Sequence, residues 1–74
     1  MKQTINIYGD TLSVEYDGNV WTTANGAQYG RARDALQHEL EDLFLASGDD
    51  LDDPEIKAEI QRALNGPRVN AGSM

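Results

Sequence analysis

The sequence predicts a small α+β domain in which a three-stranded antiparallel β-meander is followed by two α-helices. Up to Thr23, apolar and polar residues alternate with period two, as half-buried strands require. Between residues 32 and 64 the apolar residues instead recur every 3.6 positions, which is typical of amphipathic helices. We expect residues 1–66 to form one domain and residues 67–74 to be a disordered C-terminal tail, because the tail has little apolar content to pack.

The first two expected strands lie in the stretches TINIY and TLSVEY, each of which places its apolar residues on one face. A two-residue turn at Gly9–Asp10 would set the register between them. Ile7 would then face Leu12, and Ile5 would face Val14. The two apolar faces coincide in this register, and a slip of one residue would separate them.

The second turn lies at Asp17–Gly18, a dipeptide typical of type I′ hairpin turns. A two-residue loop would pair Val14 with Trp21. A three-residue loop would instead turn Val20 inward and Trp21 outward. We favour an inward Trp21, because a small domain needs its largest apolar side chain in the core.

The first helix has two possible starting points. Asn25 with Gln28 three residues later resembles a capping box and would start it early, whereas a start near Gly30 or Arg31 is equally compatible with the sequence. Gly48 is expected just after its last turn. The residues of its apolar stripe are Ala32, Ala35, Leu36, Leu40, Leu43 and Phe44.

The second helix has clear start and stop signals. Asp53, Pro54 and Glu55 are typical of an N-cap, a first-turn proline and a first-turn acid. Gly66–Pro67 should end the helix. Its apolar stripe consists of Ile56, Ile60, Ala63 and Leu64.

The composition excludes several classes of site. There is no cysteine, so the chain has no disulfide, no thiolate nucleophile and no Cys-based zinc site. The N-terminal residues lack the apolar stretch of a signal peptide, and no segment reaches membrane-spanning length. We therefore expect a soluble, cytoplasmic protein that does not bind membranes.

The spacing of the residues does not match that of a calcium-binding loop or of a nucleophile motif. A calcium loop starting at Asp49 would place Pro54 where glycine is required, and one starting at Asp50 would end on Gln61 instead of glutamate. The only histidine, His38, is expected on the polar face of its helix in a surface pair with Asp34. The G-x-S-x-G nucleophile motif is absent. We predict no enzymatic activity, no cofactor and no metal.

The net charge of −7 is concentrated in one segment. Residues 39–59 hold nine carboxylates and one cation, Lys57, whereas the rest of the chain has four acidic and five basic residues. Direct nucleic-acid binding is disfavoured, since it needs a cationic face. The segment can be a solvated face, or a surface that occupies a cleft shaped for phosphates. The candidate partner-binding residues are Glu39, Glu41, Asp42, Asp49, Asp50, Asp52, Asp53, Glu55 and Glu59.

In size, acidity and layout the whole chain resembles the small phage-encoded anti-CRISPR proteins, a group without a common motif. The resemblance implies a DNA-mimic inhibitor that docks on the DNA- or PAM-reading surface of a type I CRISPR surveillance complex. We expect the protein itself to be a monomer. Its carboxylates would stand in for phosphates opposite arginine and lysine. The partner would be a protein with a basic nucleic-acid-binding surface.

Two alternatives remain. The stretch YDGNVWTTANGAQYGRARDALQHEL is similar to the sheet-then-helix part of HicB-type antitoxins, in which case the acidic face would mask a basic toxin. Those proteins carry a C-terminal DNA-binding segment, whereas this chain ends in an acidic helix and a short tail. A structural or assembly protein of a phage or mobile element would instead use apolar surface such as Leu45, which falls on the polar side of the first helix.

Overall fold

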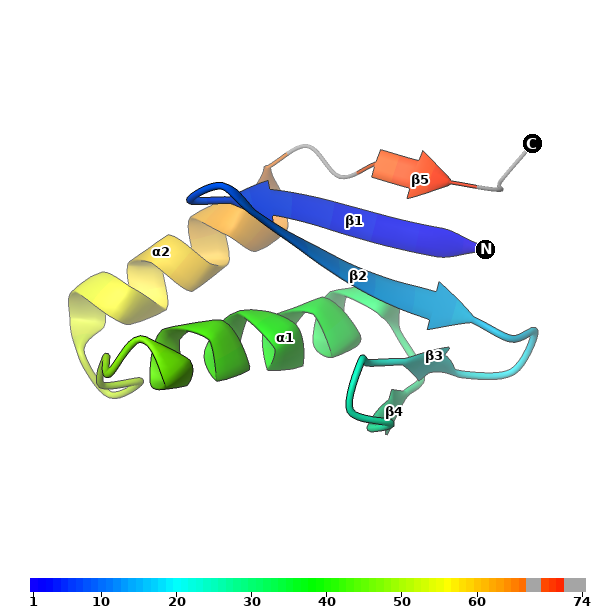
Figure 1. Cartoon of the computed structure of the whole chain (residues 1–74), viewed down its shortest axis with the longest axis horizontal. Helices are drawn as coiled ribbons and strands as arrows, with labels where there is room; N and C mark the ends of the chain where they lie inside the picture. The colour runs from blue at the N-terminus through cyan, green and yellow to red at the C-terminus, as the bar shows by residue number, and fades with distance from the viewer. Residues whose placement is uncertain (67–68, 72–74) are drawn as a thin grey trace.

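The computed structural model describes residues 1–66 and 69–71 and contains one antiparallel five-stranded sheet with the order β4-β3-β2-β1-β5. Both helices lie on the same side of this sheet (Figure 1). The α+β class is confirmed, but four strands precede the helices instead of three. The elements in chain order are β1 (Lys2–Ile7), β2 (Asp10–Tyr16), β3 (Trp21–Thr22), β4 (Gln28–Tyr29), α1 (Ala32–Ala46), α2 (Pro54–Asn65) and β5 (Val69–Ala71).

The hairpin of β1 and β2 forms, but the predicted register is wrong by two residues. Ile5 faces Leu12 and Ile7 faces Asp10, so the turn lies at Tyr8–Gly9. Both turn residues have positive φ, 51° at Tyr8 and 80° at Gly9, which is the pattern of a type I′ turn. For tyrosine this conformation costs about 1 kcal/mol. A shift of two residues preserves the side-chain alternation, so the apolar faces still coincide.

The connection from β2 to β3 is longer than predicted. Tyr16 faces Trp21, so the loop contains four residues, and the predicted pairing of Val14 with Trp21 is wrong. Oδ1 of Asp17 accepts hydrogen bonds from the backbone N–H groups of Asn19 and Val20, at 2.8 and 3.0 Å. This Asx turn stabilises the longer loop. The inward position of Trp21 is confirmed, since its side chain is buried.

The Asn25–Gly26 dipeptide forms a hairpin turn instead of a helix start. The Gly26 N–H donates to the Thr23 carbonyl at 3.0 Å, the Thr23 N–H donates to the Ala27 carbonyl at 2.9 Å, and Gly26 has φ of 91°. This pattern is a three-residue hairpin loop with glycine in the left-handed region. It creates β4, so the early helix start is wrong and the later one, with Arg31 as N-cap, is confirmed.

The core lies between the sheet and the helices, and α1 contributes most to it. Ala35, Leu36 and Leu40 are fully buried and Phe44 is 4% exposed, whereas Ala32 and Leu43 are only partly buried at the edge. The remaining buried core residues come from β1, β2, β3 and α2: Ile5, Val14, Trp21, Ile60 and Leu64.

The ends of the two helices follow the predicted signals. Gly48, with φ of 85°, donates to the Leu45 carbonyl at 3.0 Å, and Asp49 donates to the Phe44 carbonyl at 2.9 Å. These bonds form a Schellman motif after α1. Oδ1 of Asp53 accepts the Glu55 N–H at 2.9 Å, so the expected N-cap of α2 is confirmed. The helix ends at Asn65, before Gly66.

The C-terminal segment differs from the expected disordered tail at residues 69–71. These form β5, which pairs with β1 so that Lys2 faces Ala71 and Thr4 faces Val69. Strand addition at a sheet edge uses backbone hydrogen bonds, so it does not require the apolar content on which the expectation rested. Residues 67–68 and 72–74 lie outside the described residues.

The Asx turn predicts a pH-dependent stability. Hydrogen bonds from Val20 and Asn19 lower the pKa of Asp17 below its ordinary value of 3.8, so its stabilisation is present above that pH and is lost as the pH falls through the lower folded-state pKa. Asp17→Ala should therefore lower the melting temperature most near neutral pH, with a smaller difference from the parent in acid. Asp17→Asn, which keeps the acceptor oxygen, is the control. A melting difference that grows on acidification would contradict this interpretation.

Candidate interaction surface

The predicted acidic residues follow the helical hairpin made by α1 and α2. The loop between these helices lies at one end of the molecule, and β3 and β4 lie at the other (Figure 1). Four aspartates of the predicted set belong to this loop, and Glu55 lies in the first turn of α2, which begins at Pro54. We call Asp49, Asp50, Asp52, Asp53 and Glu55 the acidic hairpin end.

The loop that carries these aspartates is held in place by local contacts. Leu51 is partly buried and packs against the core cluster. Oδ1 of Asp50 accepts the Asp52 N–H at 2.9 Å, and the Asp50 carbonyl accepts the Asp53 N–H at 3.1 Å. An apolar anchor and a hydrogen-bonded turn therefore restrict the directions in which the carboxylates project.

Three members of the acidic hairpin end have carboxylates without an internal partner. Among the described residues, the side chains of Asp49, Asp52 and Glu55 form no hydrogen bond or ion pair with another group. Asp52 and Glu55 are exposed, and Asp49 is half-buried. The like charges are therefore left to solvent or to a binding partner, and their mutual repulsion opposes folding.

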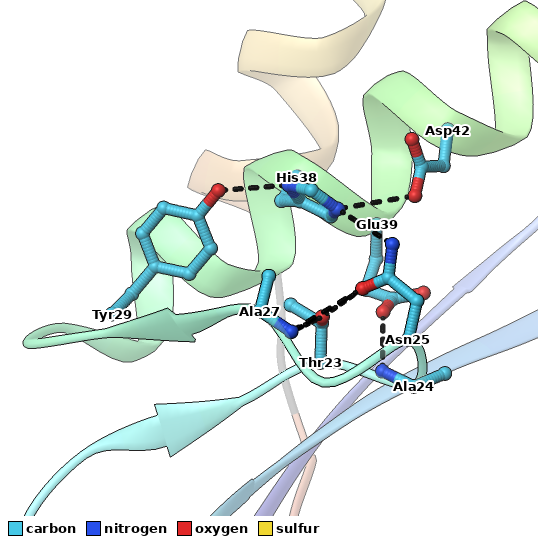
Figure 2. Close-up of polar contacts among 8 residues, drawn as sticks. All are labelled: Thr23, Ala24, Asn25, Ala27, Tyr29, His38, Glu39 and Asp42. Carbon is cyan, nitrogen blue, oxygen red and sulfur yellow. Dashed lines mark hydrogen bonds and ion pairs between the residues drawn. The ribbon is translucent and has the colours of Figure 1, made fainter.

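The predicted acids of α1 have structural partners. Oε1 of Glu39 accepts the Ala24 N–H at 2.7 Å, which ties the β3–β4 loop to α1 (Figure 2). Oε2 of Glu41 accepts a hydrogen bond from Gln37 at 3.2 Å. Glu39 and Glu41 therefore belong to the negative segment of the sequence, but their carboxylates form hydrogen bonds within the fold and are not part of the acidic hairpin end.

His38 forms a polar cluster with β4 and with the following turn of α1. Its Nδ1 lies 2.8 Å from the Tyr29 hydroxyl, and its Nε2 lies 3.1 Å from Oδ2 of Asp42 (Figure 2). Nε2 also lies 3.3 Å from Nδ2 of Asn25. The structure therefore pairs His38 with Asp42, and the predicted pairing with Asp34 is wrong.

The arrangement of Tyr29, His38 and Asp42 was not predicted from the sequence, because β4, which contains Tyr29, was not predicted. With Nε2–H donating to Asp42, Nδ1 of His38 accepts the proton of the Tyr29 hydroxyl. A hydroxyl, an imidazole and a carboxylate in this order also occur in nucleophilic sites. Here the contacts join β4 to α1 across an open cavity of about 260 Å³, lined in part by Asp34 and Gln37. The geometry favours a role in fastening the hairpin to the helix.

Three further findings bear on function. Within residues 1–66 and 69–71, no three histidine, aspartate or glutamate side chains come together as a metal site would require. Neither helix in that part of the chain has the length and apolar composition needed to cross a bilayer. Comparison of the chain with protein-family models, curated proteins and solved structures gives no match.

The two kinds of carboxylate should differ in their effect on stability. Glu39→Ala should lower the free energy of unfolding by about 1 kcal/mol, because the Ala24 N–H loses a charged acceptor. Asp52→Ala removes the same charge, but the Asp52 carboxylate accepts no hydrogen bond among the described residues. This variant should change the free energy of unfolding by less than about 0.5 kcal/mol. Urea unfolding of both variants measures this. Equal losses would contradict the division between structural and free acids.

Proposed function

We propose that this protein is a non-enzymatic inhibitor that binds a nucleic-acid-binding protein through the acidic hairpin end. One observation carries the proposal. Residues 49–55 contain five carboxylates and no basic residue, and the packing of Leu51 with the turn at Asp50 restricts the conformations of that segment. A solubilising surface needs negative charge but no fixed arrangement of it.

The electrostatics favour a partner whose natural ligand is a phosphate backbone. Duplex DNA presents one negative charge per ~1.7 Å of its axis, and proteins that bind it line the contact with arginine and lysine. A dense set of carboxylates can pair with the same side chains through charge-assisted hydrogen bonds. The field around it also accelerates association with a basic cleft, in a manner that salt suppresses.

The partner we propose to test first is a type I CRISPR surveillance complex. This choice rests on the resemblance of the chain to small anti-CRISPR proteins in size, acidity and arrangement of sheet and helices. The acidic hairpin end would block the surface that reads target DNA or the PAM. The other predicted acids have a lesser role in this proposal, because Glu39, Glu41 and Asp42 are bonded within the fold.

A second candidate function is assembly through apolar surface. Leu45 is 55% exposed on α1, which supports its predicted place on the polar side of the helix. A large exposed aliphatic side chain is a common element of protein contacts, and such a contact would strengthen or persist as salt increases. Salt dependence therefore separates the two candidates.

The inhibitor proposal predicts a charge-specific loss of binding. Changing Asp50, Asp52 and Asp53 to asparagine keeps the turn acceptor and the N-cap, so the fold should persist. Affinity for the purified surveillance complex at low salt should fall about tenfold or more.

The matched control neutralises Asp10, Glu15 and Asp34, which changes the net charge equally but away from the acidic hairpin end. It should bind like the parent in the same capture assay. Equal affinities of the two triple variants would contradict the proposal, because only total charge would then matter.

The assembly candidate predicts a different result. If Leu45 mediates a contact between copies, sedimentation should show self-association that persists at high salt and is abolished by Leu45→Asp. Ala58→Asp, at another exposed helical position, adds the same single negative charge and is the control. Self-association that survives Leu45→Asp would exclude this face of α1.

A further inference from the structure

The turn between β1 and β2 forms one wall of a groove that the proposed function does not use. The groove has a volume of about 470 Å³ and lies between this turn and α2. Its lining residues are Asn6, Ile7, Tyr8, Glu59, Arg62 and Ala63. The groove therefore combines the aromatic ring of Tyr8, the apolar side chains of Ile7 and Ala63, and the carboxylate of Glu59, which belongs to the predicted acidic set.

Tyr8 lines this groove with a backbone conformation that is unfavourable for tyrosine. Its φ of 51° lies in the left-handed region, which the first central position of a type I′ turn requires and which asparagine, aspartate and glycine adopt more readily. The side chain is 68% exposed, so burial gives little compensation. Its described aromatic contact is an edge-on one to Phe44, with ring centroids 6.2 Å apart. Among the described residues, this edge contact and the approach of the Tyr8 hydroxyl to Glu59 are what favour tyrosine over asparagine, aspartate or glycine.

The Tyr8 side chain lies near the charges of two carboxylates, Glu59 and Asp49, and of one guanidinium, Arg62. The Glu59 carboxylate as an acceptor for the hydroxyl, followed by desolvation and the charge of Glu59, raises the pKa of the Tyr8 hydroxyl. The charge of Arg62 opposes this rise, and the charge of Asp49 adds to it. Nη2 of Arg62 lies 3.9 Å from Oε1 of Glu59, at the outer limit of an ion pair. The Arg62 side chain is 75% exposed, so it can be displaced from Glu59 at little cost.

We propose that this groove binds an arginine side chain of the basic protein partner, with its guanidinium paired to Glu59 and stacked on the ring of Tyr8. Arginine fits this site better than lysine, because its planar fork pairs with a carboxylate and its weakly hydrated face stacks on aromatic rings. The net charge of −7 on each copy disfavours a second copy as the occupant, because the two copies repel each other. The inference rests on the proposed function, to which it adds a specific anchor.

The test compares Tyr8→Asn with Tyr8→Phe in the full chain, with a hexa-arginine peptide as the probe. Asparagine accepts the left-handed conformation, so the melting temperature of Tyr8→Asn should equal or exceed that of the parent. Its affinity for the peptide should fall about fivefold, because the stacking surface is lost. Tyr8→Phe keeps the ring and should bind like the parent.

Amide chemical shifts in the titration locate the contact. The largest shifts should fall on Tyr8, Glu59 and Ala63, and a hexa-lysine peptide should bind more weakly than hexa-arginine. Shifts confined to residues 49–53, or equal affinity of Tyr8→Asn and the parent, would overturn the arginine site. A large loss of melting temperature in Tyr8→Asn would assign Tyr8 a structural role and would also count against it.

The outcomes for the two proposals are separable. If hexa-arginine binds at Tyr8 but the surveillance complex is not captured, the arginine site stands and the choice of partner fails. If the complex is captured equally by Tyr8→Asn and the parent, electrostatic inhibition stands and the arginine site fails.

Discussion

The packing of the apolar face of α1 is the interaction on which the rest of this structure depends. Leu36 and Leu40 are fully buried between the sheet and α2, in a chain without disulfides. A domain of this size has only a small core, so removing either side chain would leave a cavity that the fold is poorly able to compensate. Because this face of α1 must be apolar, its charged residues are confined to the other faces of the helix and to its ends.

That confinement explains the division among the acidic residues. On the polar side of α1, Glu39 and Asp42 lie beside the β3–β4 hairpin and stabilise it through Ala24 and His38. Beyond the end of α1, no hydrogen bond joins the carboxylates of Asp49, Asp52 or Glu55 to a strand in the described part of the chain. Leu51 fixes the loop there, and the acidic hairpin end is left with unpaired like charges. We propose that such a surface, which opposes folding, serves to bind a partner and not only to keep the protein soluble.

The sequence predicts the strand and helix types well, because side-chain periodicity reports which face is buried. It does not determine register, because a shift of two residues leaves every face unchanged. The actual registers depend on Tyr8 in the left-handed region and on the side-chain acceptor of Asp17, neither of which has a strong local signal. β4 was missed because Asn25–Gly26 suits a helix cap and a hairpin equally. The contact of His38 with the Tyr29 hydroxyl was missed for the same reason, since Tyr29 lies in that strand.

The most direct test of electrostatic inhibition is a competition between this protein and target DNA for one site. The amount of protein bound to a purified type I surveillance complex would be measured while target duplex is added, at low and at high salt. If inhibition is electrostatic, the amount of protein displaced should follow the fraction of sites that duplex occupies, and binding should weaken steeply as salt increases. Binding that duplex leaves unchanged, or no binding at either salt concentration, would contradict it.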